Sequence, residues 1–216
     1  MLLHDPGADL LGPDVTHVVR ALRQLSAPAP TAELAAAASL SPARTRAALN
    51  GLVGIGLVIK SDAGRAHSYS VNPSHVAWDG IQLLLDARLV VLRQARMICG
   101  IAPPDVSIAL CAPSSAPGSA SERKVRFVIV VPDPLPIGPN IINSITNELE
   151  RVIGRMTGSE IAIEIVAEPE LRDRLGNDDD AVNQWFRSTT VHGPDLSRLM
   201  IDLNRDRLEP EEDPAV

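Results

Sequence analysis

The spacing of apolar residues near the start of the chain predicts two helices. Apolar positions recur at intervals of three and four along Val15–Leu25, which is the period of an amphipathic helix. Asp14 has the side-chain chemistry of an N-cap for this helix. The Pro-containing stretch 26–30 ends it, and a short Ala-rich helix is predicted at Thr31–Leu40.

A third helix and a hairpin are predicted directly after these two. Ser41 suits an N-cap and Pro42 suits the first helical position, where its missing N–H costs nothing. The glycine-containing segment Gly54–Val58 closes the helix, and residues 59–72 (IKSDAGRAHSYSVN) read as two short strands around Ala63-Gly64. The positions expected on the buried face of the helix are Ala43, Ala47, Leu49 (or Ala48), Leu52 and Val53.

The pattern then predicts one long helix and a change to α/β structure. The helix, at about Asp79–Cys99, is apolar on more than one side, which is typical of a helix with two partners. We therefore expect residues 77–100 to connect two domains and to pair with a second subunit. Further on, the predicted elements are strands at 106–112, 125–131 and 161–166, an amphipathic helix at 139–157, short helices at 181–188 and 194–204, and an acidic, disordered tail at 205–216.

Composition narrows the class of protein. The chain has 216 residues, 45% of them hydrophobic and 22% charged, which is ordinary for a globular protein. Aromatic residues make up only 2%, which weighs against stacking of single-stranded nucleic acid. The two cysteines lack a metal-ligand spacing. Neither a signal peptide nor a membrane span is visible, so we expect a cytoplasmic protein with no membrane partner.

The distribution of charge points to nucleic acid. The net charge is −7, yet residues 14–76 hold six arginines and lysines against three acidic residues, a net +3. Arginine and asparagine can read base edges in the major groove, and lysine, histidine and serine suit phosphate contacts. The candidate base-reading residues are Arg44, Thr45, Arg46 and Asn50, on the face of the third helix opposite its apolar one. The candidate backbone contacts are Lys60, Arg65, His67 and Ser68 in the hairpin.

Residues 14–76 resemble the winged helix-turn-helix of small bacterial transcription regulators of the arsenical-repressor-like type. The resemblance rests on ARTRAALNGLVGIGLV, as recognition helix and exit, and on GRAHSYSVN, as a wing ending in Y-x-x-N. It implies a dimer that reads a pseudo-palindromic site in double-stranded DNA. Residues 1–13 are then a Gly/Pro-punctuated lead-in.

Residues 101–204 resemble a nucleotidyltransferase-like domain in the order of their elements. That family carries G-S-x-A-R-G in a loop and then S-D-x-D, whose two aspartates hold Mg²⁺. Here the loop positions kept are Ser114, Ala116 and Gly118, with Ser115 beside them, and the S-D-x-D positions fall on Lys124, Val125, Arg126 and Phe127. Glu164 falls where a third acidic residue is found. The resemblance therefore implies a pseudoenzyme with no metal and no cofactor, whose vestigial ligand loop would comprise Ser114, Ser115, Gly118 and Glu164.

Other polar groups have simpler interpretations. His192 near Asp195 is typical of a turn rather than an acid–base pair, and Asp178–Asp180 is typical of a solvated loop. No His or Asp is placed by the sequence to activate Ser114 or Ser115 as a nucleophile.

The predicted fold class is α+β: an N-terminal winged helix-turn-helix, a linker helix and a C-terminal mixed α/β nucleotidyltransferase-like domain. We expect a homodimeric, non-enzymatic transcription regulator whose second domain is a scaffold, a sensor of a nucleotide or small-molecule effector, or a dock for a protein. Two alternatives stay open. One is an active nucleotidyltransferase using Asp133 with Glu122 or Glu164, and the other is a winged helix used for protein contacts.

Overall fold

The computed structural model describes residues 5–25, 27–63, 66–112, 124–134, 139–177 and 179–208. Within these ranges the chain is an α+β protein with ten helices, a three-stranded antiparallel sheet and a four-stranded mixed sheet. It divides into two compact units, residues 2–88 and residues 89–216. No helix among the described residues is both long enough and apolar enough to cross a membrane.

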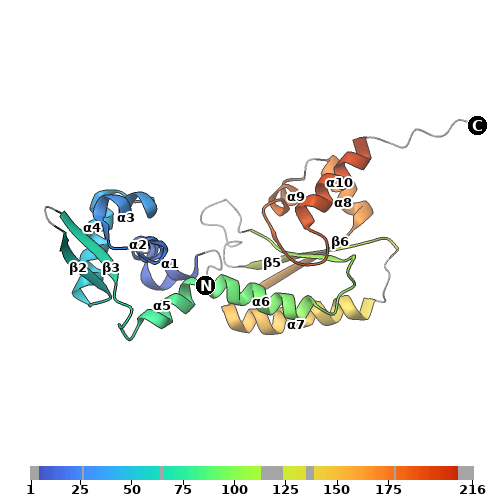
Figure 1. Ribbon diagram of the computed structural model, residues 1–216. Coiled ribbons are helices and arrows are strands. Elements are labelled where there is room, and N and C mark those ends of the chain that lie inside the picture. Colours follow the sequence, from blue (N-terminus) through green and yellow to red (C-terminus); the bar gives the residue numbers. More distant parts are fainter. Residues whose placement is uncertain are drawn as a thin grey trace, which may run out of the picture. The chain divides into compact units, whose positions relative to one another are not determined.

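The first unit consists of three core helices, a hairpin and two flanking helices (Figure 1). The three strands lie in the order β1-β3-β2, and both pairings are antiparallel. Val58 pairs with Val71 at the base of the hairpin and Ala63 with Ala66 at its far end. In chain order the elements are α1 Pro6–Leu11, α2 Pro13–Gln24, β1 Ala29–Pro30, α3 Thr31–Ala37, α4 Pro42–Gly54, β2 Val58–Ala63, β3 Ala66–Val71 and α5 Trp78–Leu85.

The start of this unit differs from the sequence prediction. Residues 6–11 form α1, in a segment for which no element was expected, because the Asp5 carboxylate caps the Ala8 N–H and Pro6 occupies the first turn. The prediction that Asp14 caps the next helix is wrong. Gly12 precedes α2, Pro13 opens it, and the Asp14 carboxylate is bound by Arg44 instead.

The core of the first unit lies between α2, α3, α4 and the sheet. Leu34 and Leu49 are fully buried there, and Tyr69 and Trp78 join them from β3 and α5. On α4 the buried residues are Thr45, Ala48, Leu49 and Leu52. Ala43 and Ala47, which were expected to be buried, are exposed, because the helix turns its 45/48/49/52 face to the core.

The long helix predicted at 79–99 is two helices. Helix α5 ends at Leu85 and α6 runs over Ala87–Cys99. Asp86 between them leaves the helical conformation (φ −94°, ψ 3°), and its carboxylate accepts a 2.8 Å hydrogen bond from Arg23 of α2. The end of the first unit is thus tied to its own core.

The second unit is a sheet with helices on both faces (Figure 1). The strand order is β6-β5-β4-β7, in which β5 and β6 are parallel and the other pairings antiparallel. Helices α6 and α7 lie on one face, and α8, α9 and α10 on the other. After α6 the elements are β4 Ser107–Leu110, β5 Val125–Val131, α7 Pro139–Thr157, β6 Ile161–Ala167, α8 Glu168–Gly176, α9 Asp180–Trp185, β7 Thr189–His192 and α10 Leu196–Leu208.

Side chains alternate between the two helical layers of this unit. Ala109, Val128 and Val130 pack with Trp185, Leu196 and Met200 on the side of α9 and α10. On α7 the fully buried residues are Ile145, Leu149 and Ile153. Helix α7 and strand β5 have the predicted bounds. Elements α8 and β7 were not predicted, and α10 continues to Leu208, inside the segment interpreted as tail.

Candidate nucleic-acid interface

Helix α4 presents the clearest candidate binding face. Ser41 caps it by accepting a hydrogen bond from the Arg44 N–H at 3.4 Å, and Pro42 opens it. With one side of the helix in the core, Arg46 and Asn50 are left exposed four residues apart, a spacing that puts them on the same face. Their neighbours on that face, Ala43 and Ala47, are small. Long polar side chains thus stand on a surface that a groove wall can approach closely.

Arg44 is exposed as predicted but has a protein partner. Its Nε and Nη2 atoms donate to the two carboxylate oxygens of Asp14, the former at 2.9 Å. The hydrogen bond from Arg44 holds the pKa of Asp14 below its usual range, and the pKa of Arg44 is raised in turn. In this conformation Arg44 is a neutralised cation. The only hint of this pair in the sequence is Asp14, an acidic residue at the start of α2.

Thr45 corrects the predicted set of base-reading residues. It is fully buried, and its hydroxyl donates a 3.0 Å hydrogen bond to the Ser41 carbonyl. The prediction that it lies on the exposed face is wrong, because Thr45 is one of the residues with which α4 packs onto the core. A threonine that bonds back to the preceding turn is compatible with such burial.

The hairpin divides its predicted contacts between two faces. Lys60 lies directly opposite the buried Tyr69, and opposite residues of a ladder share a face. Lys60 therefore lies on the face of the sheet that packs against the helices, but it is exposed because it lies past the buried residue Val58. Ser68 pairs with Ser61 on the other face, and its hydroxyl donates to the Ser61 carbonyl. The structure thus separates Ser68 from Lys60.

The far end of the hairpin carries a histidine beside a carboxylate. His67 lies opposite Asp62, and its Nδ1 is 2.6 Å from the carboxylate. Both side chains are exposed. The ring nitrogen that was expected to contact phosphate is therefore directed at a carboxylate of the same hairpin. Arg65, the remaining hairpin candidate, lies outside the described residues.

Two residues that the sequence interpretation did not treat as site residues fix the hairpin to α4. The Asn72 side-chain amide donates to the Gly56 carbonyl at 2.9 Å, and its Oδ1 accepts from the Ser74 N–H. The His75 ring bonds the Ile55 carbonyl at 3.1 Å. The end of the hairpin is thereby held against the end of the helix, so the two elements of the candidate interface form one body.

Two cations of this unit differ from the others in having no acidic partner among the described residues. Between residues 14 and 76, the described arginines and lysines other than these two are bound to carboxylates: Arg20 to Asp5, Arg23 to Asp86 and Arg44 to Asp14. Arg46 and Lys60 have no carboxylate partner among the described residues. A cation without a carboxylate partner can bind a phosphate of DNA without first breaking an ion pair within the protein.

The candidate ligand positions of the second unit are not gathered into a site in the described part of the chain. Ser114, Ser115 and Gly118 lie outside the described residues, as does Glu122. Val125 and Phe127, at the S-D-x-D positions, are buried. Glu164 accepts a 2.6 Å hydrogen bond from Arg174 of α8. Asp133 follows the end of β5, whereas Glu164 lies opposite Val128 in mid-strand.

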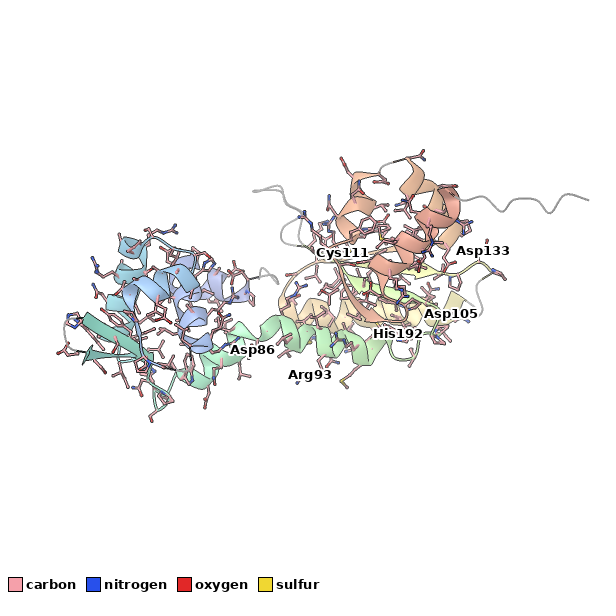
Figure 2. All side chains as sticks on the ribbon, turned by 45° about the horizontal axis from the view of Figure 1, so that its top comes forward. Asp86, Arg93, Asp105, Cys111, Asp133 and His192 are labelled. Carbon is pink, nitrogen blue, oxygen red and sulfur yellow. The ribbon has the colours of Figure 1, made fainter. Side chains whose placement is uncertain are left out.

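Other titratable groups of this unit have structural roles. His192, the last residue of β7, bonds the Pro103 carbonyl through Nε2 at 2.9 Å, while Asp195 caps α10 by accepting from the Arg198 N–H. Burial raises the pKa of both Cys99 and Cys111 to about 12, so both are thiols at neutral pH. Figure 2 shows Cys111 and Asp133 at opposite ends of the sheet. No group of three or more His, Cys, Asp or Glu side chains suited to a metal ion occurs among the described residues.

A scan against protein-family models, a search of curated proteins and a search of solved structures each find no match to this chain.

Proposed function

We propose that this chain is a DNA-binding transcription regulator whose first unit is a winged helix-turn-helix. The observation that carries the proposal is the exposed face of α4, with Arg46 and Asn50 beside small residues and a hairpin fixed to its end. The element order α2-β1-α3-α4-β2-β3 and the sheet order β1-β3-β2 support it. Helix α4 would enter the major groove, as the second helix of such motifs does.

The residues divide into two roles in this proposal. Arg46 and Asn50 would read base edges, since arginine can bond guanine bidentately and asparagine can bond adenine. Lys60 would hold the phosphate backbone from the helix side of the hairpin. Arg44 would add a contact to the phosphate backbone when Asp14 releases it. Thr45 would support α4 from within the core and touch no DNA.

The second unit would serve this regulator as a scaffold, and two copies of the chain would read two half-sites. A net charge of −8 over residues 77–216 keeps that unit away from DNA by repulsion and leaves the basic unit to bind. A nucleotide or other small effector is a further possibility for this unit, and calorimetric titration with nucleoside triphosphates, with and without Mg²⁺, tests it.

The first experiment is selection of bound fragments from sheared genomic DNA, followed by affinity measurements against salt on the best fragment. We expect an inverted repeat, and an affinity that falls steeply with salt because counterions are released from the phosphates. If no fragment is enriched even at low salt, the first unit is not a DNA reader and the protein-contact alternative is favoured.

Single substitutions then test the assignment of roles. Arg46→Ala is expected to cost about 1–3 kcal/mol of binding free energy and to relax specificity at one base pair, whereas Lys60→Ala weakens all sequences alike and lowers the salt slope by about 1. Arg155→Ala, which removes an exposed arginine from α7 of the second unit, is the matched control and leaves binding unchanged. An Arg46→Ala protein with unaltered affinity and specificity contradicts the base-reading role.

A further inference from the structure

The two edges of the four-stranded sheet are built differently. Strand β7 has only four residues, and its pairing with β4 is interrupted by a register shift at Ile108/Ala109. Strand β6 has seven residues and pairs with β5 without interruption, from Val125↔Ile161 to Val131↔Ala167. Short or irregular edges resist pairing with another chain, whereas long regular ones invite it.

Strand β6 also lacks the side chains that usually protect an edge. Its sequence, IAIEIVA, contains neither proline nor lysine. Its one charge, Glu164, is exposed and is only partly offset by Arg174 of α8, which lies 2.6 Å away. Ile165 is 46% exposed, and Ile161 and Ile163 are half-buried. Protected edges usually carry charges, proline or bulges, and β6 has one partly offset charge in their place.

The free backbone groups of β6 belong to its isoleucines. The Val125 N–H donates to the Glu160 carbonyl, and in a parallel ladder alternate residues turn their backbone groups to the same side. Residues 162, 164 and 166 therefore face β5, while 161, 163 and 165 face outward. Among the described residues, β6 pairs with no strand other than β5. Within the described part of the chain, no strand covers the outward N–H and C=O groups, which can therefore pair with a further strand.

The charge of Glu164 restricts how a second β6 can pair with the first. An antiparallel pair around a two-fold axis brings residue i opposite residue j of the partner and j opposite i. An axis at residue 164 would bring two Glu164 carboxylates face to face, which is unfavourable. An axis at Ile163 brings Ile161 opposite Ile165 and Glu164 opposite Ala162. In that register every outward-facing residue of the segment forms a hydrogen-bonded pair.

We propose that β6 is a self-association surface, on which two copies of this chain pair antiparallel through β6 with the two-fold axis at Ile163. The two sheets then become one continuous eight-stranded sheet. The isoleucines 161, 163 and 165 lie on one face of the strand and form an unbroken apolar row across the axis, while Glu164 keeps Arg174. This surface supplies the second copy that the proposed function needs, but it does not depend on DNA binding.

Helix α6 of the same unit carries a second exposed apolar surface, through which two copies could pair instead. Leu89, Val90 and Met97 are exposed on α6, and Met97 is 70% exposed. Arg93 and Arg96 lie among them and are exposed as well. Self-pairing of this face would bring like charges together, and no acidic residue of α6 lies among them. The β6 edge meets no such obstacle in the Ile163 register.

The test is the molar mass of the full chain in solution without DNA, by sedimentation equilibrium. Wild-type protein is expected at twice the chain mass of 23.0 kDa, and Ile165→Lys is expected at 23.0 kDa, because the lysine breaks the apolar row and protects the edge. Ile201→Lys replaces an isoleucine that is 56% exposed on α10 and should keep the wild-type mass. Met97→Lys should keep it too.

A second variant tests the register and guards against a folding defect in the first. Ile163→Cys should form an intermolecular disulfide on mild oxidation, because hydrogen-bonded partners lie about 5.5 Å apart at Cα. The wild type should not, since Cys99 and Cys111 are buried. The proposal is overturned by a monomeric wild type, by an open series of larger masses, by dissociation of Met97→Lys instead of Ile165→Lys, or by a dimer in which Ile163→Cys fails to cross-link. A wild-type protein that forms this dimer but binds no DNA would overturn the proposed function and leave the dimer proposal standing.

Discussion

At the scale of single residues, the carboxylate of Asp14 decides what the most obvious candidate cation can do. Arg44 stands at the start of α4, where a guanidinium would meet the DNA backbone, yet both of its donating nitrogens are directed at Asp14. In the proposed complex, DNA would have to compete with that carboxylate. Arg46, two residues on, has no such competitor among the described residues. Exposure alone therefore does not identify the cations that are ready to bind.

Asp14→Asn is expected to strengthen DNA binding by about three- to tenfold at low salt and to steepen the salt slope by about 1, because one more cation becomes available to phosphate. The measurement is affinity against salt on the selected fragment. Asp79→Asn, which removes an exposed acidic residue from α5, is the control for net charge. Equal gains in both variants would show that only total charge matters.

The same pair has a defined dependence of stability on pH. The pKa of Asp14 is lowered from its ordinary value of 3.8 in the folded chain. The stabilisation is therefore present above the unfolded-state pKa and is lost as pH falls through the lower folded-state pKa. The difference in unfolding free energy between wild type and Asp14→Asn should be constant above about pH 5 and shrink in acid. A difference that grows as pH falls contradicts the ion pair.

At the scale of elements, segments with strong apolar periodicity were predicted well from the sequence. Contacts between residues far apart in the chain could not be predicted from it. Helix α7 and strand β5 have the predicted bounds because their apolar spacing is unambiguous. The break at Asp86 depends on Arg23, 63 residues earlier, and no local pattern encodes it. Thr45 was placed on the wrong face because polarity suggested exposure, although threonine can satisfy its hydroxyl within the helix. Strand β7 was missed because four residues carry too little pattern.

Gly193, at the end of β7, offers a test of such a tertiary tie. Its φ is +72°, and an added Cβ would lie 2.0 Å from the Val106 carbonyl oxygen. Gly193→Ala should therefore destabilise the second unit by about 2–5 kcal/mol. Gly158, with φ +63° and no atom within 4 Å of an added Cβ, is the matched control, and Gly158→Ala should cost only about 1–2 kcal/mol of backbone strain. Urea unfolding measures both, and equal losses would contradict the close approach.

At the scale of the whole molecule, the chain consists of two units with separate cores. Leu49 is fully buried in the first, and Leu196 in the second. From the sequence, residues 77–100 were expected to connect a domain at 14–76 to one at 101–204, whereas the compact units of the structure meet between residues 88 and 89, within α6. The position differs because Trp78 and Leu85 of α5 are core residues of the first unit.

Separate cores predict separable unfolding. Leu49→Ala should lower the stability of residues 2–88 by about 2–5 kcal/mol and leave the second unit unchanged, and Leu196→Ala should do the reverse. Scanning calorimetry of the two variants should show different transitions shifted. A single transition that both substitutions shift equally would mean that the units unfold as one.

The strand order has a consequence for how the chain is made. Strand β4 is the first strand of the second unit in sequence, yet it lies inside the sheet, with the last strand, β7, along its second edge. The Ser107 hydroxyl is bound to the Pro194 carbonyl, 87 residues later. During synthesis the first unit can complete its core while the ribosome is still working on the second, because domains fold as units from the N-terminus. The second unit keeps one side of β4 uncovered until residue 192 emerges, so a nascent chain stalled before that point exposes a strand that the finished protein hides.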